Sequence, residues 1–143
     1  MNLSISISFP LIGSRSFNNS TLSSHYTSIG SSATPGISTI ASYNTLVHNG
    51  AYYIVSIEDL TNNQYQVSEV VVANEVSEVY VSEFGIIQTN SSIGSIGATI
   101  TSGGNVSLLF TPNANIDVQV RTYQNAIGLI NASVPYKEID FTN

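Results

Sequence analysis

Two histidines, His25 and His48, are the first residues to consider for chemistry in this sequence. A Ser-His-Asp hydrolase needs a histidine placed against a serine nucleophile and a carboxylate. Serine is so abundant here that its presence near a histidine carries no information, and no nucleophile-elbow pattern occurs. His25 belongs to a serine-rich segment and His48 stands beside an expected turn, so we interpret both as ordinary exposed side chains.

Carboxylates are the second group, because a pair of acidic side chains can hydrolyse a glycosidic bond. The candidates for such a pair are Glu69, Glu75, Glu78 and Glu83. Glu69 and Glu83 suit polar positions near strand ends, and the sequence has no tryptophan to line a sugar groove. We therefore predict that the protein is not an enzyme and has no catalytic residue. Carboxylates about 5 to 9 Å apart in a cleft would favour hydrolysis instead.

Hard oxygen ligands for a metal gather in one short segment. Glu58, Asp59 and Asn62 could hold Ca²⁺, but their spacing matches no defined calcium loop. Capping of a turn by Asp59 is the alternative, and we favour it. The chain has no cysteine, so neither a disulfide nor a cysteine metal site can form. We expect no metal and no cofactor.

Tyrosines offer binding rather than catalysis. A groove lined by Tyr26, Tyr43, Tyr52 and Tyr123 would favour a glycan ligand, because an aromatic ring provides a flat apolar face with a polar tip.

The composition limits the partners. The formal net charge is -6, with only three lysines and arginines, so no basic patch can neutralise phosphates and we expect no nucleic-acid binding. No run of residues approaches the length of a transmembrane helix, and the N-terminus does not read as a secretory signal. Charged residues make up 8% of the chain, and the uncharged polar surface favours assembly with other protein. A poorly charged monomer is the alternative.

The segment from 51 to 84 must form the scaffold for any site, because it reads as three strands joined by two short turns. Ala51, Tyr53, Val55 and Ile57 alternate with more polar residues and form the expected core face of the first strand. The apolar run 70–72 in the second strand suggests cover on both faces. Gly85, inside the third strand, predicts a bulge or a close approach of another backbone.

The second half of the chain repeats this pattern. Residues 101–104 form a hairpin connection between two further strands. In the next strand Ile116, Val118 and Val120 are expected to point inward and Arg121 outward. Seven or more short strands separated by turn residues predict an all-β, single-domain antiparallel sandwich, jelly-roll or immunoglobulin-like.

Residues 1–45 differ in texture from the sandwich domain expected over 46–143. They contain an alternating strand pattern at 3–9 and then a serine- and asparagine-rich stretch with scattered apolar residues. We expect an extended N-terminal arm with a short strand. It could lie as a loop over its own domain, or reach a neighbouring subunit to gain order.

A family resemblance narrows the function. The run YYIVSIEDLTNNQYQVSEVVV, the strand VYVSEFG at 79–85 and the segment SIGSIGATI at 92–100 resemble a β-sandwich domain of tailed-bacteriophage virion proteins, especially those of cyanophages. The resemblance covers residues 51–123. It implies a structural protein with no catalytic residues to transfer, and does not distinguish head, neck or tail.

The resemblance leads us to expect a non-enzymatic virion structural protein assembled in the host cytoplasm. Our main hypothesis is a capsid decoration or cement protein that forms a small homo-oligomer, with a trimer favoured, on the major capsid protein. The alternatives are a neck or tail appendage protein docked on a ring, or a receptor- or glycan-binding module of the virion. We expect neither nucleic acid nor membrane as a partner.

Overall fold

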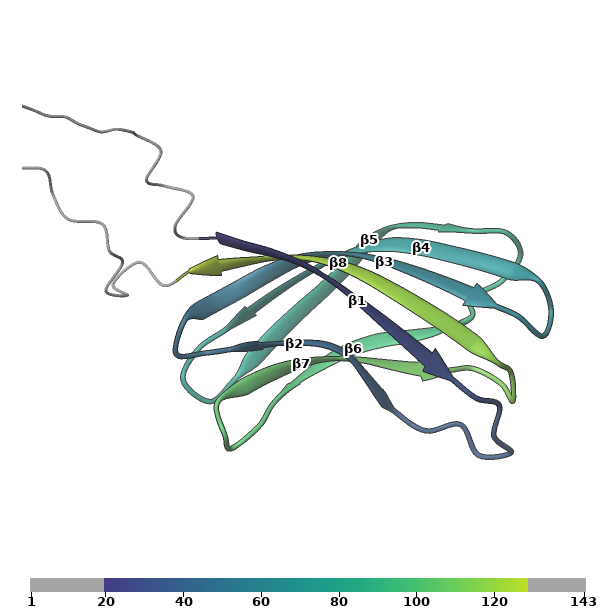
Figure 1. Ribbon diagram of the computed structural model, residues 1–143, viewed down its shortest axis with the longest axis horizontal. Coiled ribbons are helices and arrows are strands. Elements are labelled where there is room, and N and C mark those ends of the chain that lie inside the picture. Colours follow the sequence, from purple (N-terminus) through teal and green to yellow (C-terminus); the bar gives the residue numbers. More distant parts are fainter. Residues whose placement is uncertain (1–19, 129–143) are drawn as a thin grey trace, which may run out of the picture.

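The computed structural model describes residues 20–128, and this part of the chain folds into eight β-strands (Figure 1). In chain order they are β1 (Ser20–Ile29), β2 (Ser38–Asn44), β3 (His48–Asp59), β4 (Gln64–Asn74), β5 (Val79–Gln88), β6 (Gly94–Ile100), β7 (Asn105–Pro112) and β8 (Val118–Gly128). A search of the described residues finds no helix that is long and apolar enough to span a membrane.

The strands pair into two antiparallel sheets that form the two layers seen in Figure 1. The larger sheet has the order β1-β8-β3-β4-β5, and the smaller sheet has the order β2-β7-β6. The chain passes from one sheet to the other after β1, β2, β5 and β7, so the two layers share one core. The predicted all-β antiparallel sandwich is confirmed.

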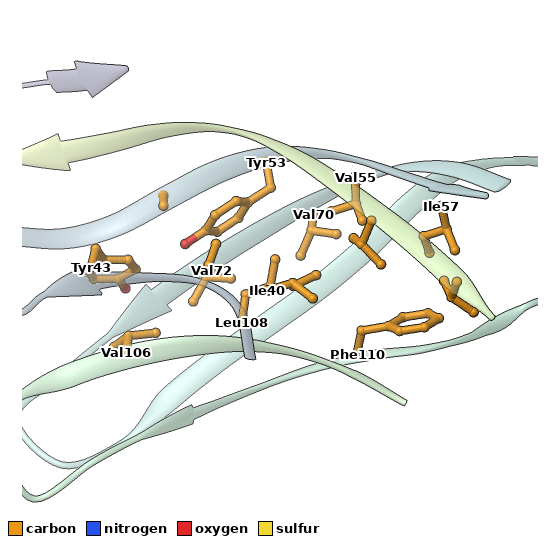
Figure 2. Packing of buried hydrophobic residues seen from close by; sticks show 14 of the residues in the cluster. Ile40, Tyr43, Tyr53, Val55, Ile57, Val70, Val72, Val106, Leu108 and Phe110 are labelled. Carbon is orange, nitrogen blue, oxygen red and sulfur yellow. The ribbon is translucent and has the colours of Figure 1, made fainter. Parts of the chain in front are cut away.

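The core lies between the facing sides of the two sheets. Tyr53, Val55 and Ile57 point inward from β3, as their alternation predicted, and Leu108 and Phe110 meet them from β7 (Figure 2). All five are fully buried. Since successive strand residues point to opposite faces, each inward row leaves an outward row on the other side of the sheet.

The second strand of the meander differs from the prediction at one residue. Val70 and Val72 are buried, but Val71 between them is 42% exposed. The expected cover on both faces of β4 is therefore wrong at this point. The smaller sheet packs on only one face of the larger sheet, so Val71 faces outward on the other.

Gly85 lies in the bulge that the sequence predicted. The register of β4 with β5 shifts between Val67 and Glu69, which pair with Ile87 and Phe84. The φ angle of Gly85 is 62°, in the left-handed region that favours glycine. The bulge keeps Phe84 and Ile87 on the same outward face of β5.

The range predicted to be an arm contributes two strands to the sheets. β1 pairs with β8 from Ser20 to Ile29, and Ile40 and Tyr43 of β2 are buried in the core. A serine-rich edge strand needs only backbone pairing on one side, which explains why its weak apolar pattern did not predict a strand. Residues 1–19 and 129–143 lie outside the described residues, and with them the strand expected at 3–9.

Candidate functional site

The outer face of the five-stranded sheet presents a broad set of large side chains. Within residues 20–128, no element covers this face, because the smaller sheet packs on the opposite side. Its exposed large hydrophobic residues include Leu22, Tyr26, Ile54, Tyr65, Val67, Val71, Tyr80, Phe84, Ile87, Tyr123 and Ile127. Apolar residues gathered on one exposed face indicate a binding surface.

A hollow of about 420 Å³ lies at the β1 side of this face. Its lining residues come from three neighbouring strands: Ser24, His25, Tyr26, Ile54, Ser56, Arg121, Thr122 and Tyr123. In the pairing register Tyr123 stands between Ser24 and Ile54, and Arg121 stands between Tyr26 and Ser56. The two short serines leave space between taller neighbours, and this difference in side-chain length forms the hollow.

Arg121 forms one wall of the hollow together with Tyr26. Its guanidinium carbon lies 5.2 Å from the centroid of the Tyr26 ring, within the range of a cation–π contact. The two residues are direct cross-strand partners on β1 and β8. The contact holds the arginine side chain against the ring and leaves the edge of the guanidinium free to donate hydrogen bonds.

Tyr52 lies on the same outer face, beyond Tyr123 and Ile54, and its hydroxyl donates a hydrogen bond of 2.9 Å to Oε1 of Glu69. This bond, with the carboxylate's charge, raises the pKa of Tyr52. Tyr65 repeats the arrangement, donating to Glu58 at 3.1 Å. The two glutamates of this face are thus engaged by tyrosines.

The structure brings together three of the four tyrosines that the sequence suggested for a groove. Tyr26 and Tyr123 line the hollow, and Tyr52 lies on the same face. Tyr43 does not belong to this group, because it is buried in the core, where its hydroxyl donates to Oδ1 of Asn74 at 2.7 Å. Burial raises its pKa to about 12. Its position on the inward row of β2 explains the difference.

Sequence reasoning did not include Arg121 or Ile54 in the groove. The alternation of β8 did place Arg121 on the outward side, but nothing local to that strand indicated that β1 would lie beside it. The hollow could have been predicted only by combining the outward-facing residues of three paired strands. That step requires the order of the strands in the sheet.

The histidines occupy different places. Nε2 of His25 lies 3.3 Å from the hydroxyl oxygen of Ser23 at the edge of the larger sheet, and Nε2 of His48 lies 3.2 Å from Oγ1 of Thr21. Both side chains are partly buried rather than exposed as expected. Desolvation lowers the pKa of His48. A catalytic triad would also need a carboxylate to orient the histidine, and these contacts do not supply one.

The four glutamates considered as candidates for a catalytic pair do not share one cleft. Glu75 and Glu78 lie in the turn after β4, where the amide of Glu75 donates to the carbonyl of Glu78 at 2.8 Å. Glu69 and Glu83 lie on the neighbouring strands β4 and β5. Glu69 pairs with Phe84, and Glu83 pairs with Val70, so the two glutamates point to opposite faces of the sheet.

Asp59 caps its turn, as we favoured. It is 2% exposed, and its Oδ1 accepts the backbone N–H groups of Thr61 at 2.9 Å and Asn62 at 3.0 Å. Its Oδ2 accepts a further bond from the Asn62 side chain at 2.9 Å. Glu58 points to the opposite face of β3, toward Tyr65. Among the described residues no cluster of acidic or histidine side chains could hold a metal ion.

Comparisons with known proteins find that this chain is similar in structure to parts of two phage tailspikes. No family model and no curated protein sequence matches it. The tailspike protein of Acinetobacter phage vB_ApiP_P1 is 15% identical, with a TM-score of 0.40, over 90% of this chain and 25% of that one. The tailspike of Acinetobacter baumannii bacteriophage Fri1 is 12% identical, with a TM-score of 0.41, over 79% of this chain and 20% of that one. The chain thus spans a quarter or less of either tailspike.

One of these neighbours corrects a prediction. The Fri1 tailspike is described as a capsular polysaccharide depolymerase. That finding overturns the prediction that the protein is not an enzyme, and the prediction is not kept. Similarity at this level transfers no functional residue to this chain.

Proposed function

We propose that this protein is a module of a bacteriophage tail appendage that binds saccharides through the hollow on the outer face of its larger sheet. The observation that carries the proposal is the grouping of Tyr26, Arg121 and Tyr123 around that hollow. Two aromatic rings and a guanidinium on a rigid sheet can stack on a sugar ring and hydrogen-bond its hydroxyl groups. A site built on paired strands also loses little entropy on binding.

The volume and lining of the hollow suit a sugar. A space of about 420 Å³ falls within the range of small-ligand sites, and its lining combines apolar rings with a few polar groups. A second hollow of about 470 Å³ lies at the end of the sandwich, lined by Thr45, Leu46, Asn49, Asn74, Glu75 and Val76. That lining contains no aromatic ring, so we prefer the first.

The virion part of the proposal comes from the sequence resemblance to phage structural domains. The names of the two tailspikes agree with a place in the tail. We therefore propose the tail appendage in preference to capsid decoration. A cement protein would need its broad face buried against capsomers, and the hollow would then have no access to a ligand.

Two measurements test this proposal. Immunogold labelling of purified virions with an antibody against the chain is expected to mark the tail, and labelling over the capsid surface would contradict the assignment. Binding of the purified protein to immobilised bacterial surface polysaccharides is expected, and it should be lost in the double variant Tyr26→Ala, Tyr123→Ala. Undiminished binding by that variant would rule out the hollow as the site.

A further inference from the structure

We infer that the hollow selects acidic saccharides, those with a carboxylate on the sugar ring, through Arg121. The inference rests on the proposed saccharide-binding function and names the class of ligand for the same site.

The distribution of positive charge supports this choice. Of the three arginines and lysines in the chain, Arg121 is the one that lies within residues 20–128. It lies in the hollow rather than elsewhere on the sandwich. In a chain of net charge -6, an anionic ligand finds few favourable contacts, and the hollow offers one of them.

The direct cross-strand partners of Arg121 do not compensate its charge. Its cross-strand partners are Tyr26 and Ser56, which carry no charge at neutral pH. Glu58 lies one row from Arg121 on the outer face, and its carboxylate accepts a hydrogen bond from Tyr65, as that of Glu69 does from Tyr52. The guanidinium is instead positioned by the ring of Tyr26 at 5.2 Å.

The geometry of the guanidinium suits a carboxylate. Its N–H groups lie in one plane as a fork that can donate two parallel hydrogen bonds to two carboxylate oxygens. Arg121 and Tyr123 lie two residues apart on β8 and point to the same face. When a sugar ring stacks on Tyr123, a carboxylate substituent of that ring can therefore reach Arg121. A neutral sugar in the same place would gain only ordinary hydrogen bonds to its hydroxyl groups, which are weaker.

The test uses matched ligands in which the carboxylate is either free or blocked as its methyl ester. The ligands are the trisaccharides of galacturonic, glucuronic and mannuronic acid, each beside its methyl ester, in calorimetric titrations of the full chain. At least one acid is expected to bind about tenfold or more tightly than its own ester. Arg121→Gln should remove that difference, and Arg121→Lys should restore only part of it, because lysine keeps the charge and loses the fork.

The outcomes separate this inference from the function on which it rests. If acids and esters bind equally and Arg121→Gln changes neither, the charge selectivity is wrong while saccharide binding stands. If no acid and no ester binds, both proposals fail. Arg121 is exposed, so its variants are expected to unfold at the same temperature as the parent chain, which thermal unfolding checks.

Discussion

Arg121 and Tyr26 face each other across the β1–β8 pair, with the guanidinium carbon 5.2 Å from the ring centroid. The contact joins a strand near the beginning of the described chain to the last one. It therefore depends on a serine-rich edge strand that contributes little to the core. The ligand binding proposed for the outer face therefore requires that β1 stays paired with β8.

The rings of the hollow should matter more for binding than other exposed rings on the same face. Tyr123→Ala is expected to weaken saccharide binding about tenfold, or about 1.4 kcal/mol, because it removes a stacking surface. Tyr80→Ala is the matched control, since Tyr80 lies on the same sheet face at the opposite edge and is exposed to a similar degree, 52% against 42%. Calorimetry measures both, and equal losses in the two variants would argue against a localised site.

The core should depend on Phe110 far more than the exposed face depends on Ile87. Phe110→Ala is expected to lower the free energy of unfolding by about 3–5 kcal/mol, because it leaves a cavity between the sheets. Ile87 is 73% exposed, so Ile87→Ala should change that free energy by less than about 0.5 kcal/mol. Urea unfolding followed by tyrosine fluorescence compares them. A loss below about 1 kcal/mol for Phe110→Ala would contradict the packing described.

A close approach between β6 and β7 gives a second test of the core. A Cβ atom on Gly94 would overlap the ring of Phe110 and the carbonyl oxygen of Thr111, whereas one on Gly97 would meet nothing within 4 Å. Gly94→Ala is expected to lower the free energy of unfolding by about 1–3 kcal/mol. Gly97→Ala on the same strand should be neutral or slightly stabilising. Similar urea midpoints for the two variants would show that the strands can separate freely at Gly94.

The folded protein is expected to lose stability in alkali because the phenol of Tyr43 is buried. Its pKa is raised by burial from 10.0 to about 12 in the folded protein. Between these values the phenol ionises in the unfolded chain while it stays neutral in the folded one, so stability falls as pH rises above 10. Tyr43→Phe cannot lose stability in this way. The stability advantage of the parent over Tyr43→Phe, measured by urea unfolding, should therefore shrink from pH 8 to pH 11, and a constant difference would contradict the buried neutral phenol.

Much of the fold could be predicted from local patterns. Alternation identified the inward row Tyr53, Val55 and Ile57, and turn chemistry identified Asp59 as a cap, because both depend on residues close in sequence. Gly85 indicated its bulge for the same reason. These features need no knowledge of which strand lies beside which.

The features that sequence could not supply depend on strand order. β1 has few apolar residues and becomes a strand by pairing with β8, which lies far away in the chain. Tyr43 and Tyr26 look alike in sequence, yet one lies on an inward row and the other on an outward row. The hollow combines residues of β1, β3 and β8, and two of the four suggested tyrosines, Tyr26 and Tyr123, line it.

Backbone amide chemical shifts during a saccharide titration test the central claim most directly. With the acidic trisaccharide that binds best, the account predicts concentration-dependent shifts centred on Tyr26, Ile54, Arg121 and Tyr123, and little change in β6 and β7. Shifts centred on the smaller sheet or on the sandwich end near Asn49 and Asn74 would contradict it, as would a spectrum that no acidic or neutral saccharide changes.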